Sequence, residues 1–281
     1  MPHAAILATP RGALHLDRTR LMGVVNVTPD SFSDGGLHAT TEAAVARALE
    51  LARQGADIID IGGESTRPGS PRVSLEEEIS RVIPVVERVA AAVEIPVSVD
   101  TYKAEVARRA VEAGASMVND VTALRGDPEM ARTVARARVP VVLMHALWPP
   151  ETMQQDPQYV DVVEDVAWFL EERARFAMGF GVSREQILVD PGIGFGKTLE
   201  HNLALLRDLP RLAALGYPLL VGPSRKSFLG KLLDRPVDAR LFGTAGAVAL
   251  CAALGAHVVR VHDLEQMRDV VRVVDAVVWQ V

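Results

Sequence analysis

Short apolar segments alternate with amphipathic segments along most of this chain. Eight of the apolar segments are rich in β-branched side chains, which is typical of strands that a parallel sheet buries on both faces. They are Leu21–Val27, Asp57–Ile61, Pro96–Val99, Ser116–Val118, Val139–Met144, Ile187–Val189, Pro218–Val221 and His257–Val261. The pattern therefore predicts eight buried strands.

Apolar positions recur at helical spacing between these strands. The predicted helices cover residues 41–54, 75–92, 103–113, 130–138, 160–178, 199–215 and 242–254. Glycines punctuate the pattern, as in Gly55-Ala56-Asp57, where a helix ends and the next strand begins.

Strand–helix units that repeat without a linker favour an α/β fold of the (β/α)8 (TIM) barrel type over an open doubly wound sheet. We expect a single domain over residues 1–281, and a short extra strand or hairpin before residue 20 that caps the barrel.

Composition narrows the class of protein. The chain is 49% hydrophobic and 23% charged, which is typical of a globular protein and excludes disordered and collagen-like classes. The net charge of −6 gives no basic excess, so a nucleic-acid partner is not expected. Without a signal-peptide pattern or a run of 18 apolar residues, we expect a soluble cytoplasmic protein with no membrane association. The single Cys251 excludes an internal disulfide and is expected to be a small buried side chain.

Polar residues follow the predicted strands where a barrel places its active site. Asp100, Asn119 and Asp190 stand at three strand ends and could hold the edge of a flat heterocycle through their side-chain oxygens. Helix capping is the alternative for each of them, but it explains the three together less well.

Cationic residues stand at other strand ends and could bind an anion such as phosphate. They are Arg67, Lys226, Arg260 and His262. Arg260 alternates with valines inside an apolar strand, which argues against a solvated position. Other arginines, such as Arg173 and Arg207, are expected to be solvated.

Some features carry less weight. Gly196-Lys197-Thr198 is similar to the end of a phosphate-binding P-loop, but Pro191 stands where that motif requires its first glycine. His145 has no partner at metal-ligand spacing, which argues against a zinc site. Trp168 and Phe169 are expected to pack in the core.

Five segments, taken in order, resemble the dihydropteroate synthase family over nearly the whole chain. They are Met22–Gly36, Asp60–Gly69, Asp190–Thr198, Gly222–Ser227 and Arg260–Asp263. The chain departs from the family after Met144-His145, where Met-Gln-Gly is usual and Ala146-Leu147-Trp148-Pro149-Pro150 stands here.

This resemblance implies an enzyme of folate biosynthesis that sulfonamides inhibit. Such a transferase moves a pterinylmethyl group: it condenses 6-hydroxymethyl-7,8-dihydropterin diphosphate with p-aminobenzoate, giving 7,8-dihydropteroate and diphosphate. The implied fold is a (β/α)8 barrel, the implied cofactor is Mg²⁺, and the implied assembly is a homodimer.

The resemblance also implies residue roles. Asp100, Asn119, Asp190, Lys226 and Arg260 would bind the pterin, and all but Asn119 would be catalytic. Asn26, Arg67, Arg260 and His262 would bind diphosphate, with Asn26 at Mg²⁺. Phe32, Thr66, Arg67, Pro68, Phe195, Lys226 and Ser227 would form the p-aminobenzoate pocket.

Two other functions remain open at this point. A pterin-binding methyltransferase would share the Asp and Asn set but would not need the diphosphate residues or Ser65-Thr66-Arg67-Pro68. A non-catalytic pterin-binding paralogue would be expected to lose residues such as Asn26 or Lys226, and both are retained.

Overall fold

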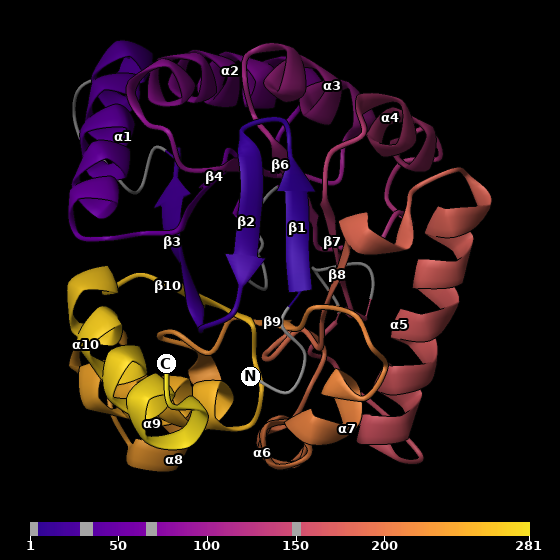
Figure 1. The fold of residues 1–281 in the computed structure, drawn as a ribbon, viewed down its shortest axis with the longest axis vertical. Helices are drawn as coiled ribbons and strands as arrows, with labels where there is room; N and C mark the ends of the chain where they lie inside the picture. The colour runs from indigo at the N-terminus through magenta and orange to yellow at the C-terminus, as the bar shows by residue number, and fades with distance from the viewer. Residues whose placement is uncertain (1–4, 29–35, 66–71, 148–152) are drawn as a thin grey trace.

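Eight parallel strands form one sheet that curves into a barrel (Figure 1). The computed structural model describes residues 5–28, 36–65, 72–147 and 153–281. The strands are β3 (Arg20–Asn26), β4 (Ile58–Gly62), β5 (Val97–Asp100), β6 (Met117–Asp120), β7 (Val141–Met144), β8 (Ile187–Asp190), β9 (Leu220–Val221) and β10 (Val258–Val261). Their order is β8-β7-β6-β5-β4-β3-β10-β9, and a parallel bridge between Val189 and Leu219 joins the two ends. The barrel and all eight predicted strands are confirmed.

Alternation along the strands divides the barrel interior into layers. The lower layer is apolar and consists of Met22, Ile58, Met117, Val142, Leu188, Leu220 and Val258. The positions two residues further along each strand are Val24, Asp60, Asn119, Met144, Asp190, Gly222 and Arg260. The interior therefore changes from apolar to largely polar toward the carboxyl ends of the strands, while alternate residues such as Ile59 and Ile61 pack outward in the core beneath the helices.

Helices surround the barrel. They are α1 (Gly36–Arg53), α2 (Leu75–Ala92), α3 (Ala104–Glu112), α4 (Met130–Ala137), α5 (Val162–Gly179), α6 (Leu199–Arg207), α7 (Leu209–Ala213), α8 (Ser227–Leu233), α9 (Leu241–Ala253) and α10 (Leu264–Val274). Short turns of 3₁₀ helix cover Arg184–Gln186 and Val237–Ala239, and a π-helical turn covers Asp275–Trp279.

The helices differ from the predicted ones in four places. The segment 199–215 is split into two helices at Asp208, because Pro210 lies in the first turn of the second helix, where proline is favoured. The first helix begins at Gly36 rather than at residue 41. The sequence pattern missed α8, which is only seven residues long, and α10, whose buried residues Leu264, Met267 and Val271 do have helical spacing.

A hairpin covers the amino-terminal end of the barrel, as predicted. Strands β1 (Ala5–Thr9) and β2 (Gly12–Leu16) pair antiparallel and cross the barrel in Figure 1. Leu7 and Leu16 are fully buried against the lower apolar layer. The hairpin therefore closes the end of the barrel that lies opposite the polar layer.

Three individual expectations can be checked on the described residues. Cys251 is fully buried in α9, as expected. Trp168 is 66% exposed, so its expected core position is wrong, whereas its neighbour Phe169 packs against the core. The expectation for Arg173 is also wrong: its guanidinium is buried and donates to the carbonyls of Ala123 and Leu124, two residues with positive φ.

No helix in the described ranges is long and apolar enough to cross a membrane.

Candidate active site

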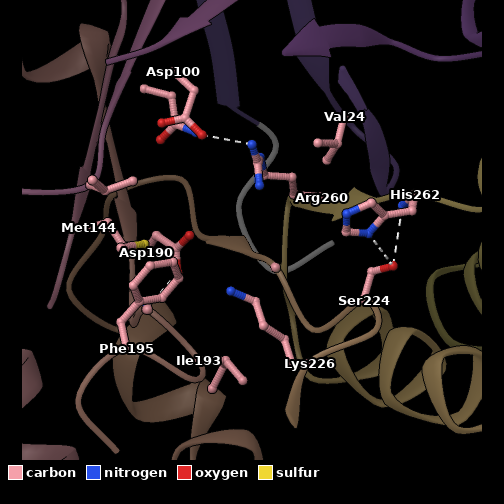
Figure 2. A pocket seen from close by; sticks show the side chains of 14 residues that line it. Val24, Asp100, Met144, Asp190, Ile193, Phe195, Ser224, Lys226, Arg260 and His262 are labelled. Atoms are coloured by element: carbon pink, nitrogen blue, oxygen red, sulfur yellow. Dashed lines mark hydrogen bonds and ion pairs between the residues drawn. The ribbon is translucent and has the colours of Figure 1, made fainter. Parts of the chain in front are cut away.

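A pocket opens at the carboxyl ends of the strands, above the lower apolar layer (Figure 2). Its lining combines one wall of carboxylates and cations with one of apolar side chains. The lining residues are Val24, Asp100, Asn119, Val121, Met144, Asp190, Gly192, Ile193, Phe195, Gly222, Ser224, Lys226, Arg260 and His262. Seven residues singled out from the sequence are thus brought together: Asp100, Asn119, Asp190, Phe195, Lys226, Arg260 and His262.

The remaining predicted site residues have different positions. Asn26 ends β3, beside Gly62 of the neighbouring strand β4, and is half-buried and outside the pocket lining. Ser227 begins α8 next to Lys226 and is exposed. Phe32, Thr66, Arg67 and Pro68 lie outside the described residues.

Arg260 is the centre of an ion-pair network on the pocket floor. Its Nε donates to Asp60 Oδ2 at 2.7 Å, and its Nη2 donates to Asp100 Oδ2 at 2.8 Å. Asn119 Nδ2 also donates to Asp60 Oδ2, at 3.1 Å. Although burial lowers the pKa of the guanidinium, the two carboxylates more than compensate and raise it. Arg260 is therefore a fixed cation.

Asp60 is a component of this site that the sequence analysis did not single out. It is fully buried and holds two pocket residues, one from β6 and one from β10, in place. A signal was present, because Asp60 interrupts the apolar strand Ile58-Ile59-Asp60-Ile61 in the same way that Arg260 interrupts its own strand.

The two aspartates of the lining titrate near neutrality. Burial raises the pKa of Asp100 to about 7, although Arg260 opposes this shift. Burial raises the pKa of Asp190 to about 6, against the backbone N–H of Gly192, which donates to Asp190 Oδ1 at 2.7 Å, and against the charge of Lys226. Asp190 thus also stabilises its own turn, as a capping aspartate would, while lining the pocket.

By contrast, Asp120 is turned away from the pocket. Its oxygens accept the N–H groups of Thr122 and Leu124, and the Thr122 hydroxyl. Asp120 points away from the pocket because it follows the inward-facing Asn119 on the same strand. These hydrogen bonds make it a turn residue.

Lys226 and His262 complete the polar lining. Figure 2 shows the Lys226 side chain extending into the pocket, and its Nζ lies 4.0 Å from the centre of the Phe195 ring. His262 Nδ1 lies 3.0 Å from Ser224 Oγ, which also accepts the backbone N–H of His262. Burial, with Arg260 nearby, lowers the pKa of His262 to about 3, so its imidazole is neutral at pH 7.

Among the described residues, no cluster of three or more His, Cys, Asp or Glu side chains could enclose a metal ion.

Comparison with known proteins agrees with this geometry. The sequence profile of the family described as pterin binding enzyme matches residues 22–262. A dihydropteroate synthase of Synechocystis is 48% identical over 94% of this chain and 91% of its own length. A structure of Xanthomonas albilineans dihydropteroate synthase with 4-aminobenzoic acid has a TM-score of 0.92 and 51% identity, covering 98% of both chains. Another, of the same enzyme with 7,8-dihydropteroate, has a TM-score of 0.86 and 50% identity, covering 94% of this chain and 95% of that chain.

The barrel and its pocket of convergent carboxylates and cations are thus those of a pterin-binding enzyme. Within this class, the relatives named above match over nearly their full length, and each is a dihydropteroate synthase. The chain belongs to the dihydropteroate synthase family.

Proposed function

We propose that this chain condenses 6-hydroxymethyl-7,8-dihydropterin diphosphate with p-aminobenzoate to give 7,8-dihydropteroate and diphosphate. The observation that carries the proposal is the convergence of Asp100, Asn119 and Asp190 with Lys226 and Arg260 in one pocket. A flat heterocycle with ring N–H groups and an exocyclic amine needs such acceptors, and a diphosphate needs such cations. We propose one domain over the whole chain for this function.

In this proposal the pterin binds deepest, against Asp100, Asn119, Asp190, Lys226 and Arg260. Asn119 donates one amide hydrogen to Asp60, so its Oδ1 is available as an acceptor. Val121 and Met144 form an apolar face beside these groups and cover the ring.

Binding of the pterin ring is expected to weaken as the pH falls. Asp190, with a pKa of about 6, and Asp100, with a pKa of about 7, gain protons on acidification and lose acceptor capacity. A group with a raised pKa that must be ionised for binding weakens binding by about tenfold per pH unit below that pKa. Fluorescence titration with 6-hydroxymethyl-7,8-dihydropterin between pH 8 and pH 5.5 tests this, because that ligand has no phosphate of its own to titrate.

The matched variant for this titration is Asp190→Asn. Its affinity is expected to be lower at pH 8, and the part of the pH dependence between pH 5.5 and 6.5 is expected to flatten. A wild-type affinity that does not change with pH would contradict the proposed role of both carboxylates.

Arg260 and His262 are proposed to bind the diphosphate, together with Asn26 and with Arg67, which lies outside the described residues. Ser224 Oγ accepts the backbone N–H of His262, so the hydroxyl hydrogen of Ser224 is free to point at His262 Nδ1. This arrangement keeps the imidazole proton on Nε2, where a neutral His262 donates to an anion.

Mg²⁺ is the proposed cofactor, and the residues present fit it in a limited way. Asn26 provides one amide oxygen at the mouth, next to Gly62, and Mg²⁺ often takes only one or two protein ligands while substrate phosphates and water supply the rest. When bound there, the ion would neutralise charge on the leaving diphosphate.

For p-aminobenzoate we propose a site nearer the rim, formed by Phe195, Lys226 and Ser227 with the loop residues Phe32, Thr66, Arg67 and Pro68. Phe195 is the aromatic member of the described wall, and the Lys226 ammonium over its ring could pair with the benzoate carboxylate.

The pocket charges suit a reaction in which diphosphate leaves before the amine attacks. As the carbon–oxygen bond breaks, positive charge develops on the pterinylmethyl carbon and is delocalised into the ring. When they are ionised, Asp60, Asp100 and Asp190 around the floor favour that charge. The neutral arylamine then attacks through its lone pair and releases a proton, a step that needs no strong base.

Diphosphate release tests the function. Purified protein with pterin diphosphate and Mg²⁺ is assayed with and without p-aminobenzoate, and the product is identified by mass. Release that depends on p-aminobenzoate, forms dihydropteroate and stops when EDTA is added supports the proposal. Tight pterin binding with no release would favour the non-catalytic alternative.

We also propose a homodimer. Exposed apolar side chains gather on α8, α9, α10 and the segments next to them, which lie side by side in Figure 1. They are Leu232, Leu233, Val237, Phe242, Leu250, Val273, Val277, Val278 and Val281. Many exposed apolar side chains on neighbouring elements are typical of a protein–protein interface.

Sedimentation equilibrium is expected to give twice the chain mass of 30.3 kDa. Phe242 is 89% exposed, so Phe242→Glu is expected to shift the protein toward the monomer without unfolding it. A wild-type monomer at micromolar concentration would refute the dimer.

A further inference from the structure

Lys197 is a buried lysine that the proposed reaction does not use. Its side chain is 3% exposed, and none of its hydrogen bonds in the described residues is to a carboxylate. Nζ lies 2.9 Å from His145 Nδ1, 3.0 Å from the carbonyl oxygen of Phe195 and 3.4 Å from the carbonyl oxygen of His145. The three N–H groups of an ammonium thus face three acceptors.

The partners of Lys197 belong to two different segments. Phe195 lies in the loop between β8 and α6, whereas His145 follows β7, directly before the residues that depart from the family pattern. Leu147 continues that segment and packs on Gly196 so closely that a Cβ on the glycine would lie 2.6 Å from Leu147 Cβ. Lys197 therefore fastens the β8–α6 loop to the end of β7.

This fastening bears directly on one wall of the pocket. Val121, Met144 and Ala146 form a small buried cluster, and Phe195 packs against it from the β8–α6 loop. The Tyr159 hydroxyl donates at 2.7 Å to the carbonyl of Gly196, the residue between Phe195 and Lys197. The carbonyls of Phe195 and Gly196 are thus held by two side chains, those of Lys197 and Tyr159.

We propose that Lys197 is a positioning residue that sets the Phe195 ring, and with it the affinity and selectivity of the arylamine subsite. The proposal rests on the proposed function, because it assigns that ring to the p-aminobenzoate site. Lys197 contacts no substrate; it acts through the backbone of Phe195 and through His145. His145 is itself fixed, with its ring edge-on to Phe169 of α5 at 4.8 Å.

The electrostatic surroundings of Lys197 agree with a structural rather than an ion-pairing role. Burial lowers the pKa of Lys197 to about 7, and Lys226 adds to this while Asp190 opposes it. Burial also lowers the pKa of His145, together with Lys197 and Arg125, so its imidazole is a neutral acceptor for Nζ. The lysine is held by dipoles, which are directional, and this suits the positioning of a loop.

Lys197→Met tests the proposal, because methionine keeps much of the aliphatic stem and removes the N–H donors. Steady-state kinetics are measured at pH 8, where Asp190 is ionised in both proteins. The KM for p-aminobenzoate is expected to rise at least tenfold, about the effect of losing one or two buried hydrogen bonds. The KM for pterin diphosphate is expected to change less than about threefold. Lys231→Met, at an exposed lysine, is the matched control and should change neither constant.

Tyr159→Phe is a milder second variant that decides the matter if Lys197→Met fails to fold. It removes one donor to the same loop, so the same selective rise in KM is expected, about two- to fivefold. Its control is Tyr217→Phe, since the Tyr217 hydroxyl contacts Arg184 near the amino-terminal end of β8. The proposal would be overturned if, in every folded variant, the KM values for both substrates changed by the same factor relative to wild type. A wild-type protein that forms no dihydropteroate would instead overturn the proposed function.

Discussion

Replacing Lys226 by alanine is expected to lower kcat/KM about 100- to 1,000-fold, which is the typical cost of removing one preorganised charged donor. Lys226 Nζ lies over the Phe195 ring at 4.0 Å, and its charge acts on Asp190. It is therefore the described cation best placed to contact both the pterin and the arylamine. The loss should appear with either substrate varied.

Stability should change little in this variant. Lys226 caps α8 with its backbone alone, because its side chain makes no capping hydrogen bond. A thermal midpoint within a few degrees of wild type is expected, and Lys231→Ala serves as the control for removal of a lysine on the same helix. Activity within tenfold of wild type would remove Lys226 from the proposed site.

Replacing Arg260 by methionine is expected to impair both stability and activity. The variant leaves Asp60, which is fully buried, without its strongest partner, and breaking a buried ion pair in this way costs about 3–5 kcal/mol. Asp60 Oδ1 already has no hydrogen-bond partner in the described part of the chain, so Asn119 alone would remain on the carboxylate. Urea unfolding measures the loss.

The double variant Asp60→Asn with Arg260→Met separates the two effects. Most of the lost stability is expected to return, because the Asp60 charge is removed and Asp100, whose pKa Arg260 lowers, can take up a proton. Activity should remain at least about 100-fold below wild type. Recovery of activity in the double variant would show that Arg260 acts only by neutralising Asp60. Stability that is unchanged in the single variant would contradict the geometry of the floor.

The sequence was most informative where burial of a strand requires a particular pattern of apolar residues. Strands buried on both faces must be apolar, so Asp100, Asn119 and Asp190 stand out at their ends, and all three line the pocket. Arg260 was found by the same contrast within a strand. Asp60 shows the same contrast within its strand, although it is not among the predicted site residues.

Lys197 could not have been assigned from sequence alone. Its environment is created by His145, 52 residues away along the chain, and by the backbone of its own loop, neither of which leaves a periodic pattern. The same holds for Arg173, which resembles any surface arginine until the left-handed residues Ala123 and Leu124 present their carbonyls to it. Short helices such as α8 are lost for a related reason: seven residues contain too few turns to show a period.

The β1–β2 hairpin closes one end of the barrel, so the barrel is open only at the other end. Substrates and products must then enter and leave through that one opening. In the proposed arrangement the pterin at Asp190 lies deeper than p-aminobenzoate beside Phe195, so the heterocycle is expected to enter before its partner. The joined product must leave as one piece by the same route. The order of substrate binding and product release in each turnover would thus depend on a hairpin that lies at the opposite end of the barrel from the reaction.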